Sequence, residues 1–319
     1  MIIVTGGAGF IGSNLVKGLN DSGITDIVVV DSLRNSSKFK NLISLQISHY
    51  VDKYDFIDNL DHYNLAEAEI IFHMGACSDT MEDDAVYMMK NNYDYSVKLL
   101  NYAVDKKISF IYASSASTYG DGNKGFIETR SCEDPLNLYA FSKFLFDQYV
   151  RRIMPNVSSQ VVGLRYFNVF GMQENHKGRM ASVACHFYNQ IIENGIMKLF
   201  KGSDHFLRDF IFVDDVVKIN KFFYDNPDKS GIFNCGTGEA QSFLAIAKIM
   251  QSMFKSAEIE FVDFPDKLIG KYQEYTKADI ANLRTAGFQD DFMKLEDSLV
   301  KYVNYLNESG GYFQYEENQ

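Results

Sequence analysis

TGGAGFIG, residues Thr5 to Gly12, is the stretch that decides the fold. It follows a short apolar run at Ile2–Thr5 and precedes a segment with helical spacing. Its glycines, Gly6, Gly9 and Gly12, let the chain turn tightly and let its backbone approach a ligand closely. Free N–H groups at the start of the next helix favour an anion there. The stretch therefore predicts a strand, a phosphate-binding turn and a helix, as in proteins that bind dinucleotides.

Outward from this turn, short β-branched runs alternate with helical stretches. The predicted strands are Ile2–Thr5, Ile27–Asp31, Ile70–His73, Phe110–Ser114 and Val161–Tyr166. The predicted helices are Ile11–Leu19, Met88–Val104 and Tyr139–Ile153. Continuous apolar strands separated by helices indicate a parallel sheet covered on both faces. The fold class is α/β, with a doubly wound parallel sheet of the Rossmann type.

The regular alternation of apolar strands and helices ends after Gly171. The polar stretch Gln173–Met180 predicts a loop. A helix at Ser182–Asn194 and strands at Met197–Phe200, Arg208–Val213, Ile232–Cys235 and Ile259–Val262 are expected to follow. We expect a cofactor-binding domain made of residues 1–170 plus 211–241. A smaller mixed α/β domain for the substrate then takes residues 171–210 plus 242–319.

Composition narrows the class of protein. The chain has 319 residues, 46% apolar and 23% charged, which is ordinary for a globular protein. Its net charge of −11 provides no overall field for nucleic acid or anionic lipid. An anionic ligand must therefore be held by local basic residues or helix N-termini. We expect neither nucleic acid nor membrane as a partner.

The four cysteines, Cys77, Cys132, Cys185 and Cys235, are widely spaced and form no CxxC pair. Reduced thiols are therefore expected rather than a disulfide framework, and no metal site is predicted. No apolar run approaches the roughly 18 residues of a membrane span. The chain begins directly with a strand rather than a secretion signal, so a cytoplasmic protein is predicted.

Asp31 ends the second predicted strand, where a carboxylate accepts hydrogen bonds from the adenosine ribose. Alone it favours NAD, because it repels a 2′-phosphate. Basic residues follow at Arg34, Lys38, Lys40 and Lys53. They either neutralise a 2′-phosphate or form a solvated basic loop. The residues leave NAD and NADP open, with NADP slightly favoured.

A second motif, Tyr139-Ala-Phe-Ser-Lys143, lies on a predicted helix, where positions i and i+4 share one face. A free phenol has a pKa near 10 and is a poor base. A nearby cation, Lys143 together with an oxidised nicotinamide, is expected to lower the pKa of Tyr139. Ser115 ends a predicted strand and can bind a substrate hydroxyl beside the phenol. Ligands of open α/β sheets bind beyond these strand ends.

The glycine spacing, the strand-end serine and the YxxxK motif resemble the extended short-chain dehydrogenase/reductases that act on sugar nucleotides. Further tracts are similar to the ADP-L-glycero-D-manno-heptose 6-epimerase family over residues 1 to about 308. These tracts are FHMGACSDT (Phe72–Thr80), NNYDYS (Asn91–Ser96), RYFNVFG (Arg165–Gly171), HKGRMASVA (His176–Ala184), RDFIFVDDV (Arg208–Val216) and FPDKLIGKYQ (Phe264–Gln273).

The resemblance implies interconversion of ADP-heptoses at carbon six by tightly held NADP, for the lipopolysaccharide inner core. The carbon-six hydroxyl is oxidised by hydride transfer, and the hydride then returns to the other face. Such a step fits two acid/base groups, which the resemblance assigns to Tyr139 and Lys177. From the residues alone, Lys177 could equally bind a phosphate or be solvated. The family also forms closed homo-oligomers, pentamers or larger.

The resemblance further assigns binding residues. Those expected along the cofactor are Gly6, Gly9, Phe10, Ile11, Gly12, Asp31, Ser32, Lys38, Lys53, Met74, Gly75, Ala76, Cys77, Ser78, Asn91, Lys143, Val169 and Lys177. Those expected to hold the ADP-sugar are Ser115, Asn168, Arg179, His186, Phe200, Lys201, Gly202, Ser203, Arg208 and Tyr272. Three positions depart from the family pattern: Met74 replaces an acidic residue, Arg179 a small polar one and Lys271 an arginine. His186 could instead pack on the core, and Asn168 could cap its strand.

Two rival functions remain at this stage. One is another sugar-nucleotide epimerase or a dehydratase. A dehydratase usually carries an acidic pair after the catalytic Ser-Thr, whereas Ser115 is followed by Ala116 and Ser117. The other is an NADP-binding regulator without chemistry, which commonly lacks the Tyr or Lys of YxxxK. Both are present here, which favours an enzyme.

Overall fold

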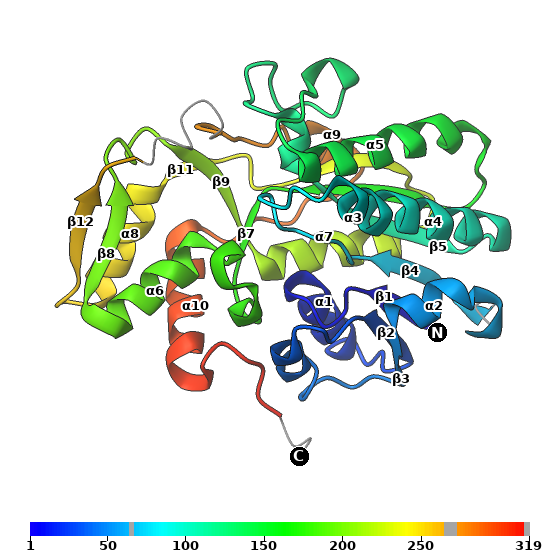
Figure 1. The fold of residues 1–319 in the computed structure, drawn as a ribbon, viewed down its shortest axis with the longest axis horizontal. Coiled ribbons are helices and arrows are strands. Elements are labelled where there is room, and N and C mark those ends of the chain that lie inside the picture. The colour runs from blue at the N-terminus through cyan, green and yellow to red at the C-terminus, as the bar shows by residue number, and fades with distance from the viewer. Residues whose placement is uncertain (64–66, 265–272, 316–319) are drawn as a thin grey trace.

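The fold was obtained as a computed structural model that describes residues 1–63, 67–264 and 273–315 (Figure 1). Its main sheet has seven parallel strands in the order β10-β6-β5-β4-β1-β2-β3. These strands are β1 (Ile2–Thr5), β2 (Ile27–Asp31), β3 (His49–Asp52), β4 (Ile70–His73), β5 (Ser109–Ser115), β6 (Val161–Tyr166) and β10 (Gly231–Cys235). The predicted doubly wound parallel sheet is confirmed.

Helices cover both faces of this sheet, as Figure 1 shows. They are α1 (Phe10–Asn20), α2 (Lys53–Asp58), α3 (Ala85–Met89), α4 (Tyr95–Lys106), α5 (Leu138–Ile153) and α7 (Val213–Asp225). Helices α1 and α7 pack together against one face, and α4 and α5 lie on the other. Residues of β1, β2, β4 and β6 are buried, because both faces are covered.

The strand order places β1 between β2 and β4, so chain connections leave β1 in opposite directions. This is the topological switch point, where the carboxyl ends of neighbouring strands open a crevice. The glycine turn follows β1, and the tract that begins at Met74 follows β4. The fold thus brings these two sequence motifs to one edge of the sheet.

A smaller lobe lies to the left in Figure 1, built on two short sheets. One has the order β11-β9-β7, with β7 (Asn168–Phe170), β9 (Leu207–Phe212) and β11 (Ala240–Ser242); the other pairs β8 (Ile196–Phe200) with β12 (Glu258–Val262). Its helices are α6 (Val183–Asn194), α8 (Phe243–Met253) and α10 (Leu295–Ser309), whereas the short α9 (Ala281–Thr285) lies against β10. A separate apolar core joins β7, α6, α8 and α10. Within the described residues, no helix combines the length and the apolar character that a bilayer crossing requires.

The structure differs from the sequence prediction in a few elements. The helix expected at Met88–Val104 is divided into α3, a π-helical turn η4 (Lys90–Asp94) and α4. The edge strand β3 was not predicted, because its residues are mostly exposed and carry no apolar run. Gln173–Met180 was predicted as a loop, and part of it forms a 3₁₀ turn, η8 (Asn175–Met180).

Candidate active site

The glycine turn forms a cradle that only glycine permits. Gly6 has φ +70°, and a Cβ there would lie 2.5 Å from the backbone nitrogen of Gly75. A Cβ on Gly12 would lie 2.2 Å from the Gly6 carbonyl oxygen. Helix α1 then begins at Phe10, and no side chain caps its N-terminus. Its N–H groups and dipole therefore face the crevice, which fits the pyrophosphate of a dinucleotide.

Asp31 lies at the carboxyl end of β2, beside this cradle. Its carboxylate accepts hydrogen bonds from the N–H of Ala8 at 2.9 Å and from the N–H of Ser32 at 2.6 Å. The ammonium of Lys38 forms an ion pair with the same carboxylate. Because Lys38 offsets the negative charge of Asp31, this corner of the site repels a second anion less than Asp31 alone would.

The other basic residues expected near the cofactor differ in the side chains that they contact. Lys53 donates to the side-chain oxygen of Asn91, so two predicted cofactor residues lie in contact. Arg34 instead stacks on the ring of Tyr54 at 4.9 Å. Lys40 lies 5.6 Å from the ring of Tyr312 near the C-terminus. Lys38 and Lys53 are therefore the basic residues held in contact with other predicted cofactor residues.

The tract after β4 is fixed by buried polar residues that the sequence analysis did not single out. His73 contacts the hydroxyl of Thr5 at 2.6 Å and that of Ser96 at 2.8 Å. Asn92 accepts a hydrogen bond from the N–H of Cys77 at 2.8 Å and donates one to its carbonyl at 2.9 Å. These contacts hold the coil of Gly75, Ala76, Cys77 and Ser78 beside the glycine turn.

Met74 and Val169 are two further predicted cofactor residues, and Met74 directly follows the carboxyl end of β4. The phenol of Tyr166 donates to the sulfur of Met74 at 3.2 Å. Val169 lies in β7, paired with Ile211 of β9. Met74 also packs against the main apolar core, so its side chain has a structural role.

Ser115, Tyr139 and Lys143 come together beyond the carboxyl end of β5. Asn137 caps α5 by accepting the N–H of Ala140 at 2.8 Å, which places Tyr139 in the first turn of the helix. Lys143 lies one turn later and donates to the carbonyl of Ala113 at 2.8 Å. Ser115 hydrogen-bonds the Tyr139 phenol. The predicted grouping of these side chains is therefore present in the structure.

The pKa of Tyr139 in the protein alone lacks the contribution of the oxidised nicotinamide that the sequence prediction included. Burial raises it above its usual value, and the hydrogen bond from Ser115 only partly opposes this. Burial also lowers the pKa of Lys143 to about 8, against the attraction of Asp147 and Cys77. The expected lowering of the Tyr139 pKa is therefore not produced by the protein alone. Without a further positive charge, the phenol keeps its proton at neutral pH.

Lys177 lies in η8, on the loop that follows β7. Its ammonium lies 4.9 Å from the centre of the Phe10 ring, at the start of α1. Burial lowers the pKa of Lys177, and the carboxylate of Glu174 opposes that shift. A second lysine with a lowered pKa therefore lies beside the glycine turn.

Several residues expected to hold the sugar nucleotide are engaged with other parts of the chain. Arg179 forms an ion pair with Asp79 at 2.5 Å, which joins η8 to the tract after β4. The ring of His186 contacts the carbonyl of Arg179 at 3.3 Å. Lys201 pairs with Asp263 at 2.6 Å.

The remaining predicted substrate residues that the structure describes lie in the smaller lobe. Asn168 accepts a hydrogen bond from Thr276 at 3.5 Å, and Phe200 packs edge-on against Phe264. Arg208 is buried over the ring of Phe243 at 5.7 Å. Gly202 follows the end of β8, and Ser203 beside it has a buried hydroxyl without a hydrogen-bond partner among the described residues. Tyr272 and Lys271 lie outside the described residues.

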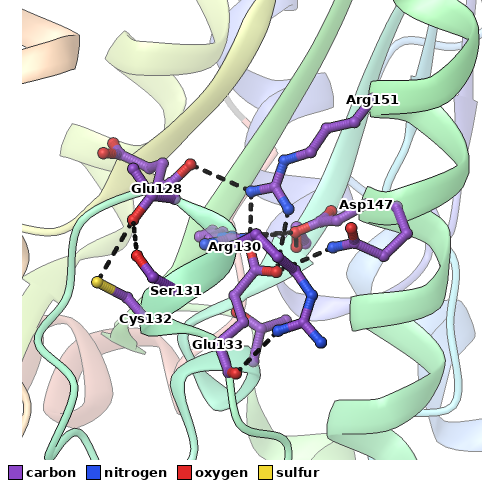
Figure 2. A network of polar contacts seen from close by, with 12 residues as sticks. Glu128, Arg130, Ser131, Cys132, Glu133, Asp147 and Arg151 are labelled. Carbon is purple, nitrogen blue, oxygen red and sulfur yellow. Dashed lines mark hydrogen bonds and ion pairs between the residues drawn. The ribbon is translucent and has the colours of Figure 1, made fainter.

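A buried ionic network includes Glu133, Asp147 and Arg151, which Figure 2 labels, together with Arg165. Arg165 of β6 is fully buried and bonds the carboxylate of Asp147 through Nε at 2.9 Å and Nη2 at 2.8 Å. It also pairs with Glu133, which accepts two bonds from Arg151 at 2.6 and 3.0 Å. Asp147 further accepts the hydroxyl of Ser114 at 2.9 Å. The network ties β5, β6 and α5 together directly beneath the strand end that carries Ser115.

Comparisons with known proteins show which family and which enzymes this chain is similar to. The sequence profile of the NAD dependent epimerase/dehydratase family matches residues 2–236. A curated ADP-L-glycero-D-manno-heptose-6-epimerase from Brachyspira hyodysenteriae is 59% identical over 98% of this chain and 99% of its own. The crystal structure of the Helicobacter pylori ADP-L-glycero-D-manno-heptose-6-epimerase is 30% identical, with a TM-score of 0.85 over 96% of both chains. A UDP-N-acetylglucosamine 4-epimerase from Methanobrevibacter ruminantium is 26% identical, with a TM-score of 0.84 over 96% of this chain and 97% of its own.

Proposed function

The chain belongs to the NAD dependent epimerase/dehydratase family, and we propose that it converts ADP-D-glycero-D-manno-heptose to ADP-L-glycero-D-manno-heptose by inverting carbon six. The high identity to the Brachyspira hyodysenteriae enzyme, over nearly the whole of both chains, supports this substrate. The product would serve as a precursor of the lipopolysaccharide inner core. The enzyme is an isomerase that uses a nicotinamide dinucleotide.

The observation that supports the proposal is the presence of two separate groups able to transfer a proton, one beyond the carboxyl end of β5 and one beside the glycine turn. One is the phenol of Tyr139, bonded to Ser115 with Lys143 one helical turn away. The other is the ammonium of Lys177, which lies over the Phe10 ring at the start of α1. An epimerase must act on both faces of one carbon, and two such groups provide for that.

In the proposed epimerisation each residue has a separate role. The bound nicotinamide supplies a hydride acceptor that can also return the hydride. Ser115 Oγ orients the carbon-six hydroxyl, and Tyr139 Oη accepts its proton or gives it back. Lys143 holds positive charge near the phenol, which favours the phenolate. Lys177 Nζ moves the corresponding proton for the other epimer.

We propose that the nicotinamide cofactor is NADP. The support is the ion pair between Lys38 and Asp31, because it offsets the carboxylate that would repel a 2′-phosphate. Lys53, held by Asn91, is a second cation at this side of the sheet. Arg208 and Ser203 are proposed to hold the diphosphate and sugar of the substrate. The division into cofactor and substrate domains, a cytoplasmic location and a homo-oligomeric state remain predictions.

Removing the charge of Lys38 should weaken NADP selectively. In Lys38→Ala, Asp31 keeps its charge and its backbone donors but loses its ion-pair partner, so NADP affinity is expected to fall roughly 10- to 100-fold, as for a lost charge-assisted bond. NAD affinity should change much less. Titration of each nucleotide into the protein measures both values. Lys40→Ala is the matched control, because Lys40 lies against Tyr312 instead. Equal losses for both nucleotides would argue against the proposed 2′-phosphate site.

Replacing Lys177 by methionine should spare the fold and slow epimerisation by about 100-fold, the effect of losing one acid/base group. Forward and reverse kcat/KM should fall by the same factor, since a variant leaves the equilibrium constant unchanged. Epimer separation at timed intervals measures both directions. Lys98→Met, exposed on α4 beside Asp58, is the control that should retain full activity. Near-normal turnover in Lys177→Met would remove this residue from the mechanism.

The decisive test of the function is direct. Purified protein is incubated with ADP-D-glycero-D-manno-heptose, and the two carbon-six epimers are separated by chromatography. UDP-glucose is tested in parallel as the substrate of a different epimerase of this fold. Accumulation of the L-glycero epimer, with UDP-glucose unchanged, is the expected result. No new epimer from a protein that carries its cofactor would overturn the proposal.

A further inference from the structure

Glu174 is a fully buried carboxylate on the loop that carries Lys177, and the reaction described above assigns it no role. It lies three residues before Lys177, and its backbone carbonyl accepts the N–H of that lysine at 2.9 Å. A buried charge needs several hydrogen-bond donors to be tolerated. The donors around Glu174 therefore indicate what it holds in place.

Two elements outside this loop supply three of these donors, and the N–H of Gly171 supplies a longer one at 3.4 Å. The N–H of Ser182 donates to one carboxylate oxygen of Glu174 at 2.6 Å. The hydroxyls of Ser182 and Tyr302 donate to the other oxygen at 2.7 and 2.9 Å. Ser182 is the N-cap of α6, and Tyr302 lies in the middle of α10. Glu174 thus joins the start of α6, the C-terminal helix and the Lys177 loop at one buried point.

Gln173, the residue before Glu174, links the same loop to the glycine turn through Asn41. The side chain of Asn41 donates to the carbonyls of Ala8 and Gln173, at 3.0 and 3.1 Å. It also contacts the ring of His176 at 3.2 Å. Ala8 belongs to the glycine turn. The loop is therefore held between the glycine turn on one side and the Glu174 junction on the other.

We propose that Glu174 is a positioning residue, whose buried carboxylate fixes the Lys177 loop to α6 and α10 and holds the Lys177 ammonium at the glycine turn. This inference rests on the proposed function, in which Lys177 is the second proton-transfer group. Its consequence is that α10, far from the catalytic residues in sequence, takes part in setting the active site through Tyr302.

Charge around Lys177 comes mainly from this carboxylate over the working pH range. The other titratable groups acting on it are Cys185 of α6 and its chain neighbour His176. Burial raises the pKa of Cys185 to about 11, and burial together with Lys38 and Lys177 lowers that of His176 to about 4. Both groups are therefore neutral between pH 6 and 9. Of these groups, Glu174 is the one that favours the protonated form of Lys177.

The test measures Lys177 itself and needs no substrate. Protein as purified is labelled briefly with an amine-acylating reagent across a pH series, and mass spectrometry of the Lys177 peptide reports the labelling midpoint. In Glu174→Gln the midpoint should fall by about 0.5–1 pH unit, because an opposite charge has been removed. Glu193→Gln, an exposed acid on α6, is the control that should leave the midpoint unchanged. An unshifted midpoint in folded Glu174→Gln would overturn the proposal.

A second variant decides the matter if Glu174→Gln does not fold. Tyr302→Phe removes one hydrogen bond from Glu174 and leaves its charge in place. We expect Lys177 to be labelled several-fold faster at a fixed pH and kcat to fall several-fold with KM little changed, because the loop is held less firmly. Wild-type labelling and wild-type kcat in Tyr302→Phe would refute the positioning role. If the wild-type protein makes no epimer, the proposed function fails while the labelling result still judges Glu174.

Discussion

Phenylalanine in place of Tyr139 is expected to lower kcat for epimerisation by about 10³- to 10⁴-fold, the upper part of the range for a lost acid/base group. The substitution deletes the oxygen that, in the proposed reaction, exchanges a proton with the carbon-six hydroxyl beside Ser115. The ring remains, so α5 should keep its packing. KM should change only a few-fold, because the lost interaction acts mainly in the transition state.

The raised pKa of Tyr139 explains why the loss should be so large. Burial keeps the phenol protonated in the protein alone, and Ser115 opposes this only in part. The phenolate thus depends on positive charge beyond that of the protein alone, which in the proposed reaction an oxidised nicotinamide would add to that of Lys143, one helical turn away.

Tyr149→Phe is the matched control for this prediction. Tyr149 lies on the same helix, and its phenol donates to Asn101 at 2.5 Å on the surface. Its loss should leave turnover within about twofold of the wild type, since a surface substitution rarely shifts stability by more than ~0.5 kcal/mol. If Tyr139→Phe retained a tenth or more of the wild-type kcat, Tyr139 would not be the proton-transfer group.

The central strands could be predicted from sequence with little error, for a physical reason. β1, β2, β4 and β6 have the predicted bounds, because a parallel strand covered on both faces is a continuous apolar run. β3, β7 and β11 were missed or merged, because they are short or lie at edges where no burial pattern is imposed. Their existence follows from tertiary pairing, which a single sequence does not display.

The site could be predicted in part. The glycine turn and the Ser115, Tyr139 and Lys143 group could be found, because their spacing follows from strand and helix geometry. Residues that act by being buried could not, because a side chain's type does not reveal its burial. One signal was available: Arg165 stands inside the apolar run of β6, and a charge in such a strand requires a buried partner. Asp147, one turn beyond Lys143, was that partner, but the sequence alone does not identify it.

Replacing Arg165 with methionine should cost about 3–5 kcal/mol of unfolding free energy, the loss expected when a buried pair loses one member. Asp147 would keep the hydroxyl donors of Tyr112 and Ser114 but lose its ion-pair partner, and Glu133 would keep Arg151 and the side-chain amide of Gln148. For a chain of this size the melting temperature should fall by roughly 5–8 °C. Arg152→Met, exposed on α5 over the ring of Tyr149, is the control and should shift it far less.

Arg165→Met could lower the melting temperature because it leaves buried carboxylates unpaired or because it removes packing. The pH dependence of the melting temperature and a second substitution distinguish these two causes. Arg151 and Arg165 overcome the effect of burial and hold the pKa of Glu133 below its usual value, so its stabilising contribution is present above about pH 4.5 and is lost as pH falls through the lowered pKa. Without Arg165, burial is opposed by Arg151 alone, so the pKa of Glu133 should rise and the penalty for its buried charge should fade as it becomes protonated. The difference in melting temperature from the wild type should therefore shrink between pH 7.5 and pH 4.5.

Adding Asp147→Asn should restore part of the lost stability at pH 7.5, because it removes one unpaired charge. A melting difference that does not change with pH, and no recovery in the double variant, would show that packing and not charge sets the role of Arg165.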